Sequence, residues 1–75
     1  MKVTIYSTPT CPYCVMAKEF FKEKGIEYTD YNVAEDQDKA KEMIKKSGQM
    51  GVPVIDIDGE IMVGFDKAKV EVLIK

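Results

Sequence analysis

The chain has 75 residues, 45% of them hydrophobic and 32% charged, and its 11 lysines and 13 acidic residues leave a net charge of −2. These values are typical of one small globular domain, so we expect a single domain over residues 1–75, and the slight negative charge without arginine argues against a nucleic-acid-binding surface. No apolar run approaches the roughly 20 residues of a membrane span and no signal-peptide pattern precedes the first apolar segment, so we expect a cytoplasmic protein that binds no membrane.

A strand and a helix are predicted at the start of the chain. Residues 2–7 alternate apolar and polar side chains and are rich in β-branched types, a pattern typical of a strand. Pro12 suits the first position of a helix, which we expect to run to Lys24 with Gly25 behind its end. The apolar residues that recur with the helical period are Tyr13, Ala17, Phe20 and Phe21, although Tyr13 is expected to face solvent.

A second strand and a second helix follow. Residues 26–33 contain two tyrosines among acidic residues and indicate a strand at the edge of a sheet. Because a helix joins this strand to the first, the two should lie parallel in a right-handed βαβ unit. Glu35 or Asp36 suits the N-cap of the second helix, and Gly48 suits its end. The predicted buried stripe of this helix consists of Ala40, Met43 and Ile44.

The last third of the chain predicts a hairpin. Residues 52–57 form the strongest strand pattern of this half, and Pro53 is expected at the strand's beginning because proline cannot donate to a central ladder. Asp58-Gly59 suits a two-residue hairpin turn, from which residues 60–63 return antiparallel.

The order of elements predicts an α/β fold. Asp66 suits the N-cap of a last helix over residues 67–74, which completes the order β-α-β-α-β-β-α. Helices in this order can cover both faces of a four-stranded mixed sheet. Open α/β sheets place their functional sites at the carboxyl ends of strands, and the only two cysteines follow the carboxyl end of the first strand.

Cys11 and Cys14 lie where the first strand gives way to the first helix. A thiol at a helix N-terminus meets unpaired backbone N–H groups and the positive end of the helix dipole, and both favour the nucleophilic thiolate. A second thiol three residues later lies on the same helix face and can attack a mixed disulfide formed by the first. The spacing therefore indicates a two-cysteine redox centre with Cys11 and Cys14 as catalytic residues.

Other roles for the cysteine pair are open at this point. A structural disulfide would close a very short loop and so stabilise the fold by only about 2 kcal/mol. A transition metal is the stronger alternative, because small copper carriers also place two cysteines at this spacing near a first helix. Without histidine and with only two thiols, the chain cannot supply a protein-only zinc site, whereas an iron–sulfur cluster bridged between two chains by glutathione stays open.

Over essentially its whole length the sequence resembles the glutaredoxins, small dithiol oxidoreductases of the thioredoxin fold. The motif Cys11-Pro12-Tyr13-Cys14 matches the dithiol motif of that family letter for letter. Residues 47–49 followed by Val52-Pro53 resemble the segment that leads into the family's cis-proline. Gly64 and Asp66 resemble the family's start of the last helix. The resemblance implies a glutaredoxin fold and a thiol–disulfide oxidoreductase.

The resemblance also assigns roles to residues around the motif. Cys11 would be the exposed nucleophile and Cys14 the resolving thiol. With Pro53 in cis, the Val52 backbone would lie beside the two sulfurs and pair with an extended glutathione or peptide like an added strand. The loop after the hairpin would receive the glutamyl end of glutathione, and Tyr13 would flank the substrate. The complete set expected to contact substrate or glutathione is Thr8, Pro12, Tyr13, Gly51, Val52, Pro53, Gly64, Phe65 and Asp66.

Departures from the common glutaredoxin pattern leave the electron donor open. Thr8 stands where a lysine or arginine commonly attracts a glutathione carboxylate, and Gly51 stands where threonine commonly precedes Val-Pro. Gly64-Phe65 resembles instead the glutaredoxin-like redoxins that serve ribonucleotide reductase and are recharged by thioredoxin reductase. The resemblance therefore implies glutathione as co-substrate, thioredoxin reductase, or both, with disulfide-containing or glutathionylated proteins, including ribonucleotide reductase, as partners. We expect a monomer that needs no metal and serves electron transport and cell redox homeostasis.

Overall fold

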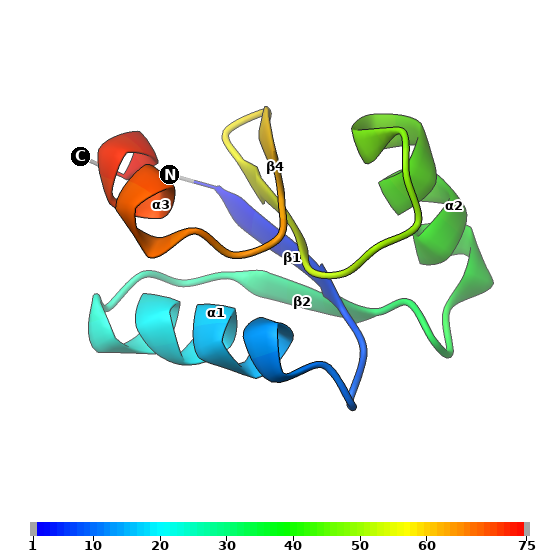
Figure 1. Ribbon diagram of the computed structural model, residues 1–75, viewed down its shortest axis with the longest axis horizontal. Coiled ribbons are helices and arrows are strands. Elements are labelled where there is room, and N and C mark those ends of the chain that lie inside the picture. The colour runs from blue at the N-terminus through cyan, green and yellow to red at the C-terminus, as the bar shows by residue number, and fades with distance from the viewer. Residues whose placement is uncertain (1, 75) are drawn as a thin grey trace.

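The computed structural model describes residues 2–74, and Figure 1 shows how their elements are arranged. Within these residues, three helices flank one four-stranded sheet with the strand order β2-β1-β3-β4. β2 runs parallel to β1, whereas β3 and β4 join the sheet antiparallel. The predicted element order and the mixed sheet are thereby confirmed. The elements are β1 (Val3–Ser7), α1 (Pro12–Glu23), β2 (Thr29–Asn32), α2 (Gln37–Ser47), β3 (Val54–Ile57), β4 (Glu60–Val63) and α3 (Lys67–Leu73).

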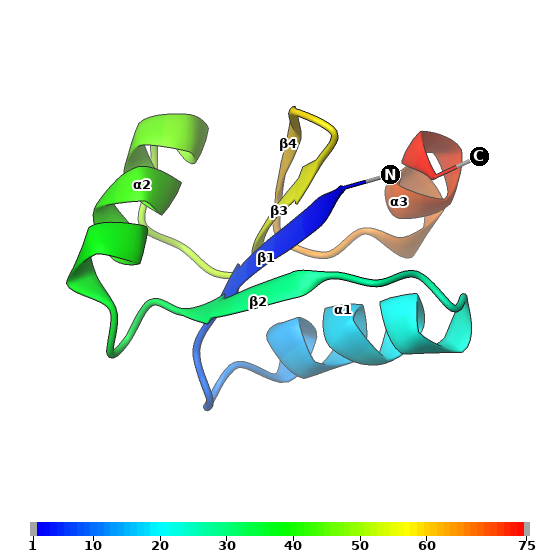
Figure 2. The ribbon, with the colours of Figure 1, turned by 180° about the vertical axis from the view of Figure 1, so that it is seen from behind.

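The helices cover both faces of the sheet. α1 and α3 lie on one face and α2 on the other, as two opposite views show (Figures 1 and 2). The larger apolar cluster, which includes Phe21 and Val70, lies under α1 and α3, and the smaller one joins Tyr6 to Met43 under α2. Because β1 is central and has helices on each side, all five of its residues are buried. The alternation of apolar and polar side chains in β1 therefore does not divide a buried face from an exposed one, because both faces are buried.

Two strands are shorter than their sequence patterns. β2 is confirmed as an edge strand but pairs only over Thr29–Asn32, while Ile26 and Tyr28 pack against the larger apolar cluster instead. β3 starts at Val54, directly after Pro53, because proline has no N–H to donate to the ladder. The other predicted ranges differ from the observed ones by at most one residue at an end.

Capping side chains begin α2 and α3 as predicted. Asp36, rather than Glu35, is the N-cap of α2, and its carboxylate accepts a hydrogen bond from the Lys39 N–H at 3.1 Å. Asp66 accepts one from the Lys69 N–H at 3.3 Å at the start of α3. None of the helices in the described part of the chain has the length and apolar character needed to cross a membrane.

The hairpin between β3 and β4 turns at Asp58 and Gly59, where φ is 50° and 93°. Positive φ at both central residues is the type I′ geometry, which matches the twist of the two strands that it joins. Glycine adopts this geometry without steric cost, and aspartate tolerates it better than most residues. The predicted two-residue turn is therefore confirmed.

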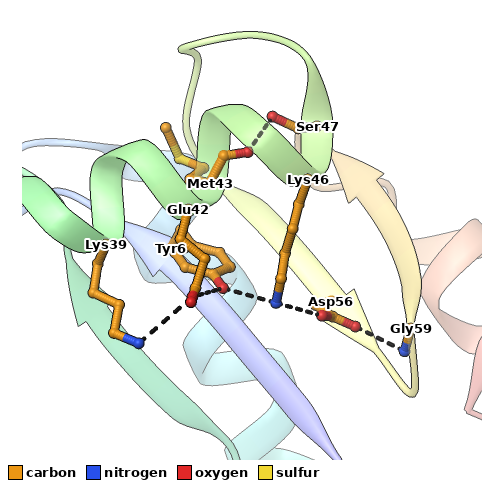
Figure 3. Close-up of polar contacts among 8 residues, drawn as sticks. All are labelled: Tyr6, Lys39, Glu42, Met43, Lys46, Ser47, Asp56 and Gly59. Carbon is orange, nitrogen blue, oxygen red and sulfur yellow. Dashed lines mark hydrogen bonds and ion pairs between the residues drawn. The ribbon is translucent and has the colours of Figure 1, made fainter.

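A chain of polar contacts ties α2 to the sheet (Figure 3). The hydroxyl of the fully buried Tyr6 donates a hydrogen bond to Glu42 Oε2 at 2.5 Å and accepts one from Lys46 Nζ at 3.0 Å. Lys46 Nζ also lies 2.9 Å from Asp56 Oδ2 on β3. Burial raises the pKa of Tyr6, and the hydrogen bonds to Tyr6 and Asp56 raise the pKa of Lys46. The network thereby fixes the position of the helix whose end leads to Pro53.

Candidate active site

Cys11 begins α1 at its N-cap position. Its backbone is extended, with φ −96° and ψ 110°, and its Sγ accepts a hydrogen bond from the Cys14 N–H at 3.3 Å. Pro12 follows at the first turn of the helix, as predicted. The Cys11 N–H donates to the Thr8 carbonyl at 3.3 Å, which closes the loop after β1. The Cys11 sulfur thus lies at the helix end where backbone N–H groups and the helix dipole stabilise negative charge.

The two sulfurs differ in their exposure to solvent. Cys11 is half-buried, whereas Cys14, one helical turn further along, is fully buried. Both are free thiols, so the structure represents the reduced dithiol. A disulfide that approaches from solvent can therefore reach the Cys11 sulfur before that of Cys14.

Burial raises the pKa of Cys14 to about 12, and its hydrogen bond with Cys11 acts in the same direction. The positive charge of Lys18 opposes this shift. Lys18 Nζ lies 2.9 Å from Asp30 Oδ2, and the other oxygen of that carboxylate accepts a hydrogen bond from the Ser7 hydroxyl at 2.6 Å. Sequence patterns carry no signal for this contact, because the three residues come from three different elements.

We expect Cys11 and Cys14 to differ in reactivity toward iodoacetamide. Because burial raises the pKa of Cys14 to about 12, this thiol stays almost entirely protonated at pH 7, and the thiolate is the form that iodoacetamide attacks. Iodoacetamide should label Cys11 at pH 7 and leave Cys14 unlabelled in the folded protein, which peptide mass spectrometry would show. Equal labelling of both cysteines under these conditions would contradict the burial of Cys14.

The same shift should make the reduced protein less stable in alkali. An unfolded cysteine ionises near pH 8.5 and folded Cys14 near pH 12, so unfolding is favoured as the pH rises between these values. The stability that the protonated thiol contributes is complete below about pH 8.5 and is lost as the pH approaches 12. Urea unfolding at neutral and alkaline pH should show this loss, and Cys14→Ala should reduce it.

The loop before β3 brings a backbone carbonyl to Cys11. The Val52–Pro53 peptide bond is cis, as the family resemblance implies, and Cys11 Sγ lies 3.9 Å from Val52 O. Pro53 is buried, and its carbonyl accepts a hydrogen bond from the Gly64 N–H at 2.8 Å. Three segments that are distant along the chain therefore meet beside the dithiol.

The other predicted contact residues differ in their exposure and in their partners. Tyr13 is 60% exposed, as expected for a side chain that faces solvent. Phe65 is half-buried, with its ring centroid 5.7 Å from that of Phe20, and the Asp66 carboxylate caps α3. The last two side chains thus have structural partners, and their contacts with substrate stay predictions. Thr8, Pro12 and Val52 adjoin Cys11 directly, through a hydrogen bond, the chain and the 3.9 Å contact. Gly51 and Pro53 flank Val52 along the chain, and Gly64 hydrogen-bonds Pro53.

Sequence reasoning missed two features near this site. The side chain of Gln49 hydrogen-bonds both polar backbone groups of Gly51, next to Val52. In addition, a shallow pocket lies between α1 and the start of α3. No pattern signals this pocket, because segments far apart in the chain form it. Its lining residues are Met16, Glu19, Phe20, Glu23, Phe65 and Lys67.

Comparisons with known proteins agree with this geometry. The model of the glutaredoxin family matches residues 3–62. An uncharacterised glutaredoxin-like 8.6 kDa protein in the rubredoxin operon of Clostridium pasteurianum is 53% identical over 73 residues, which cover 97% of each chain. Glutaredoxin 3 of Escherichia coli K12 is 41% identical over 64 residues, which cover 85% of this chain and 77% of that protein. The glutaredoxin-like NrdH-redoxin from Escherichia coli shares the fold, with a TM-score of 0.86 and 23% identity over 97% of this chain and 95% of that one.

These similarities decide among the alternatives that the sequence left open. The α/β architecture is the thioredoxin-like fold of the glutaredoxins. The family match and this fold support a thiol–disulfide oxidoreductase in general, and they favour neither a copper carrier nor a cluster-binding module. Because the family model covers most of the sequence and a glutaredoxin-like relative matches nearly all of it, the chain belongs to the glutaredoxin family.

Proposed function

We propose that the protein reduces protein disulfides and glutathione mixed disulfides through a Cys11–Cys14 dithiol cycle. The Cys11 thiolate attacks one sulfur of the substrate disulfide, whose S–S bond breaks, and the other sulfur leaves as a thiolate that takes up a proton. Cys14 then loses its proton and attacks Cys11 Sγ, so that the substrate's remaining sulfur leaves and a Cys11–Cys14 disulfide forms. Two electrons have then passed from the dithiol to the substrate, and a donor must return them.

The arrangement of the two thiols at the start of α1 carries this proposal. Half-buried Cys11 caps the helix and accepts the Cys14 N–H at 3.3 Å, so the two residues are in contact before any disulfide forms. Cys14 is buried, and its pKa of about 12 keeps it a thiol at neutral pH. It therefore does not compete with Cys11 for the substrate, and it acts only after a mixed disulfide has formed on the adjacent sulfur.

The Val52 backbone would hold the substrate beside Cys11. Val52 O lies 3.9 Å from Cys11 Sγ, so an extended peptide that pairs with this backbone would bring its own sulfur close to the nucleophile. Glutathione, which carries peptide bonds on both sides of its cysteine, suits this mode as co-substrate. Exposed Tyr13 would flank the bound molecule, and residues 64–66 would receive its glutamyl end.

Either glutathione or a thioredoxin reductase would return the electrons. Thr8 offers no positive charge to a glutathione carboxylate, which favours the reductase. The related NrdH-redoxin from Escherichia coli is described as having a thioredoxin-like activity profile, which points in the same direction. The proposed protein partners are disulfide-containing or glutathionylated proteins, including ribonucleotide reductase, and the proposed setting is a monomer in the cytoplasm.

A coupled assay tests the function and identifies the donor. In one arm the oxidised protein is mixed with glutathione and glutathione reductase, and in the other with thioredoxin reductase. Both arms contain NADPH and an insulin disulfide, and the loss of NADPH is followed. Turnover with at least one donor system is expected, and Cys11→Ser should abolish it. If neither donor supports turnover and the dithiol instead binds copper(I) stoichiometrically, with both cysteines protected from alkylation, the oxidoreductase proposal is wrong.

A further inference from the structure

The loop between α2 and β3 is held by one carboxamide. Gln49 Oε1 accepts a hydrogen bond from the Gly51 N–H at 2.5 Å, and Gln49 Nε2 donates one to Gly51 O at 3.0 Å. The partners fix the orientation of the carboxamide, because the reverse orientation would set donor against donor and acceptor against acceptor. The Gln49 carboxamide thus hydrogen-bonds both the N–H and the C=O of Gly51.

The base of this loop is tied to the end of α2. Ser47 Oγ lies 2.7 Å from Met43 O and 3.0 Å from Gln49 O, and the Gln49 N–H donates back to Ser47 Oγ at 3.4 Å. The Gln49 backbone is therefore tied to the C-terminal turn of α2, the helix that the Tyr6 network fixes to the sheet. The carboxamide therefore extends from a backbone position that is hydrogen-bonded to the end of α2.

The absence of a side chain at Gly51 leaves room for the Gln49 carboxamide. Gly51 is not among the glycines with positive φ. A Cβ atom placed on it would lie 2.6 Å from Gln49 Oε1, a distance that forces the carboxamide to move. A side chain at position 51 would therefore displace the Gln49 carboxamide from the position in which it bonds Gly51.

The hydrogen bonds between Gln49 and Gly51 also set the direction of the Val52 N–H. The Gly51–Val52 bond is trans, since the cis bond of the described chain is Val52–Pro53. In a trans peptide the C=O and the N–H point to opposite sides. Because Gln49 holds Gly51 O, the Val52 N–H points away from Gln49, while Val52 O lies beside Cys11 Sγ.

We propose that Gln49 is a positioning residue that orients the Val52 N–H toward the backbone of a bound disulfide substrate. This inference rests on the proposed pairing of Val52 with the substrate. It narrows the preferred substrates to disulfides whose reacting sulfur is flanked by peptide bonds, such as oxidised glutathione or an extended peptide. Small disulfides without an amide group would gain nothing from Gln49.

The proposal can be tested by measuring how fast the reduced protein reacts with two different disulfides. No electron donor is needed, because the protein itself supplies the electrons. Oxidised glutathione carries peptide bonds next to its sulfur, and bis(2-hydroxyethyl) disulfide carries none. We expect Gln49→Ala to lower the second-order rate constant for oxidised glutathione about tenfold, equivalent to about 1.4 kcal/mol, and that for the small disulfide far less. Gln49→Glu keeps an acceptor for the Gly51 N–H but loses the donor to Gly51 O, so it should resemble Gln49→Ala. Gln37→Ala, which changes an exposed glutamine at the start of α2, should leave both constants unchanged.

A double-mutant cycle separates orientation by Gln49 from a general loss of structure. Gly51→Ala should displace the carboxamide and slow the reaction with oxidised glutathione about as much as Gln49→Ala. The double variant should be no slower than either single one, because the Cβ no longer meets Gln49. Additive losses, or an equal loss with both disulfides, would overturn the role of Gln49 while the wild-type activity stands. A wild-type protein that reduces neither disulfide would overturn the proposed function and this inference together.

Discussion

Cys11→Ser should lower the rate of disulfide reduction by roughly 10³-fold or more, because a hydroxyl is a far weaker nucleophile than the sulfur that we propose attacks the substrate. Cys14 cannot take over the attack, since it is fully buried and has a pKa of about 12. The measurement is the reduction of an insulin disulfide or of oxidised glutathione by a stoichiometric amount of reduced protein. A Cys11→Ser variant that keeps most of this activity would contradict the role of Cys11 as the nucleophile.

Cys14→Ser is the matched control for this result. It keeps the attacking sulfur but removes the resolving one, so a mixed disulfide should accumulate on Cys11 and be visible as a mass increase in the intact protein. The sulfur of Cys11 remains the N-cap of α1 in this variant, and its hydrogen bond from the backbone N–H of residue 14 is retained. The double variant, which lacks both sulfurs, should show no adduct. An adduct that forms on Cys14 when Cys11 is replaced would reverse the assigned order of the two thiols.

Phe21→Ala should remove a large share of the protein's free energy of unfolding. Phe21 is fully buried in the larger apolar cluster and packs its ring against Phe20 and Tyr28. Removing such a ring costs roughly 3–5 kcal/mol, because the site cannot close the cavity completely. A domain of this length has a total stability of only roughly 4–11 kcal/mol, at about 0.05–0.15 kcal/mol per residue. Urea unfolding followed by circular dichroism measures the difference.

Tyr13→Ala provides the comparison on the same helix. Tyr13 is 60% exposed, so its removal leaves no cavity and should change the free energy of unfolding by less than about 0.5 kcal/mol. A loss of stability as large as that of Phe21→Ala would show that Tyr13 packs in the fold and does not stand free to flank a substrate. A small loss in Phe21→Ala would contradict the assignment of Phe21 to the core.

The sequence alone determined the features that depend on neighbours along the chain. Local hydrogen bonding and backbone geometry predict the helix start at Cys11 and Pro12, the cap Asp66 and the Asp58-Gly59 turn. They also predict an acidic cap for α2, at Glu35 or Asp36, and the structure selects Asp36. The order of strands and helices follows from hydrophobic periods of two and 3.6 residues, which are also local. The dithiol motif added the family, and with it the expectation of a cis bond before Pro53.

Only the tertiary structure decided which residues meet and which are shielded from water. The second face of β1 is buried because α2 covers it, and Tyr6 therefore needs Glu42 and Lys46 as partners for its hydroxyl. Likewise, the high pKa of Cys14 results from packing by distant segments, and the contact between Cys11 and Val52 joins residues 41 positions apart. Burial and long-range contacts depend on how all elements pack at once, and no window of neighbouring residues contains that information.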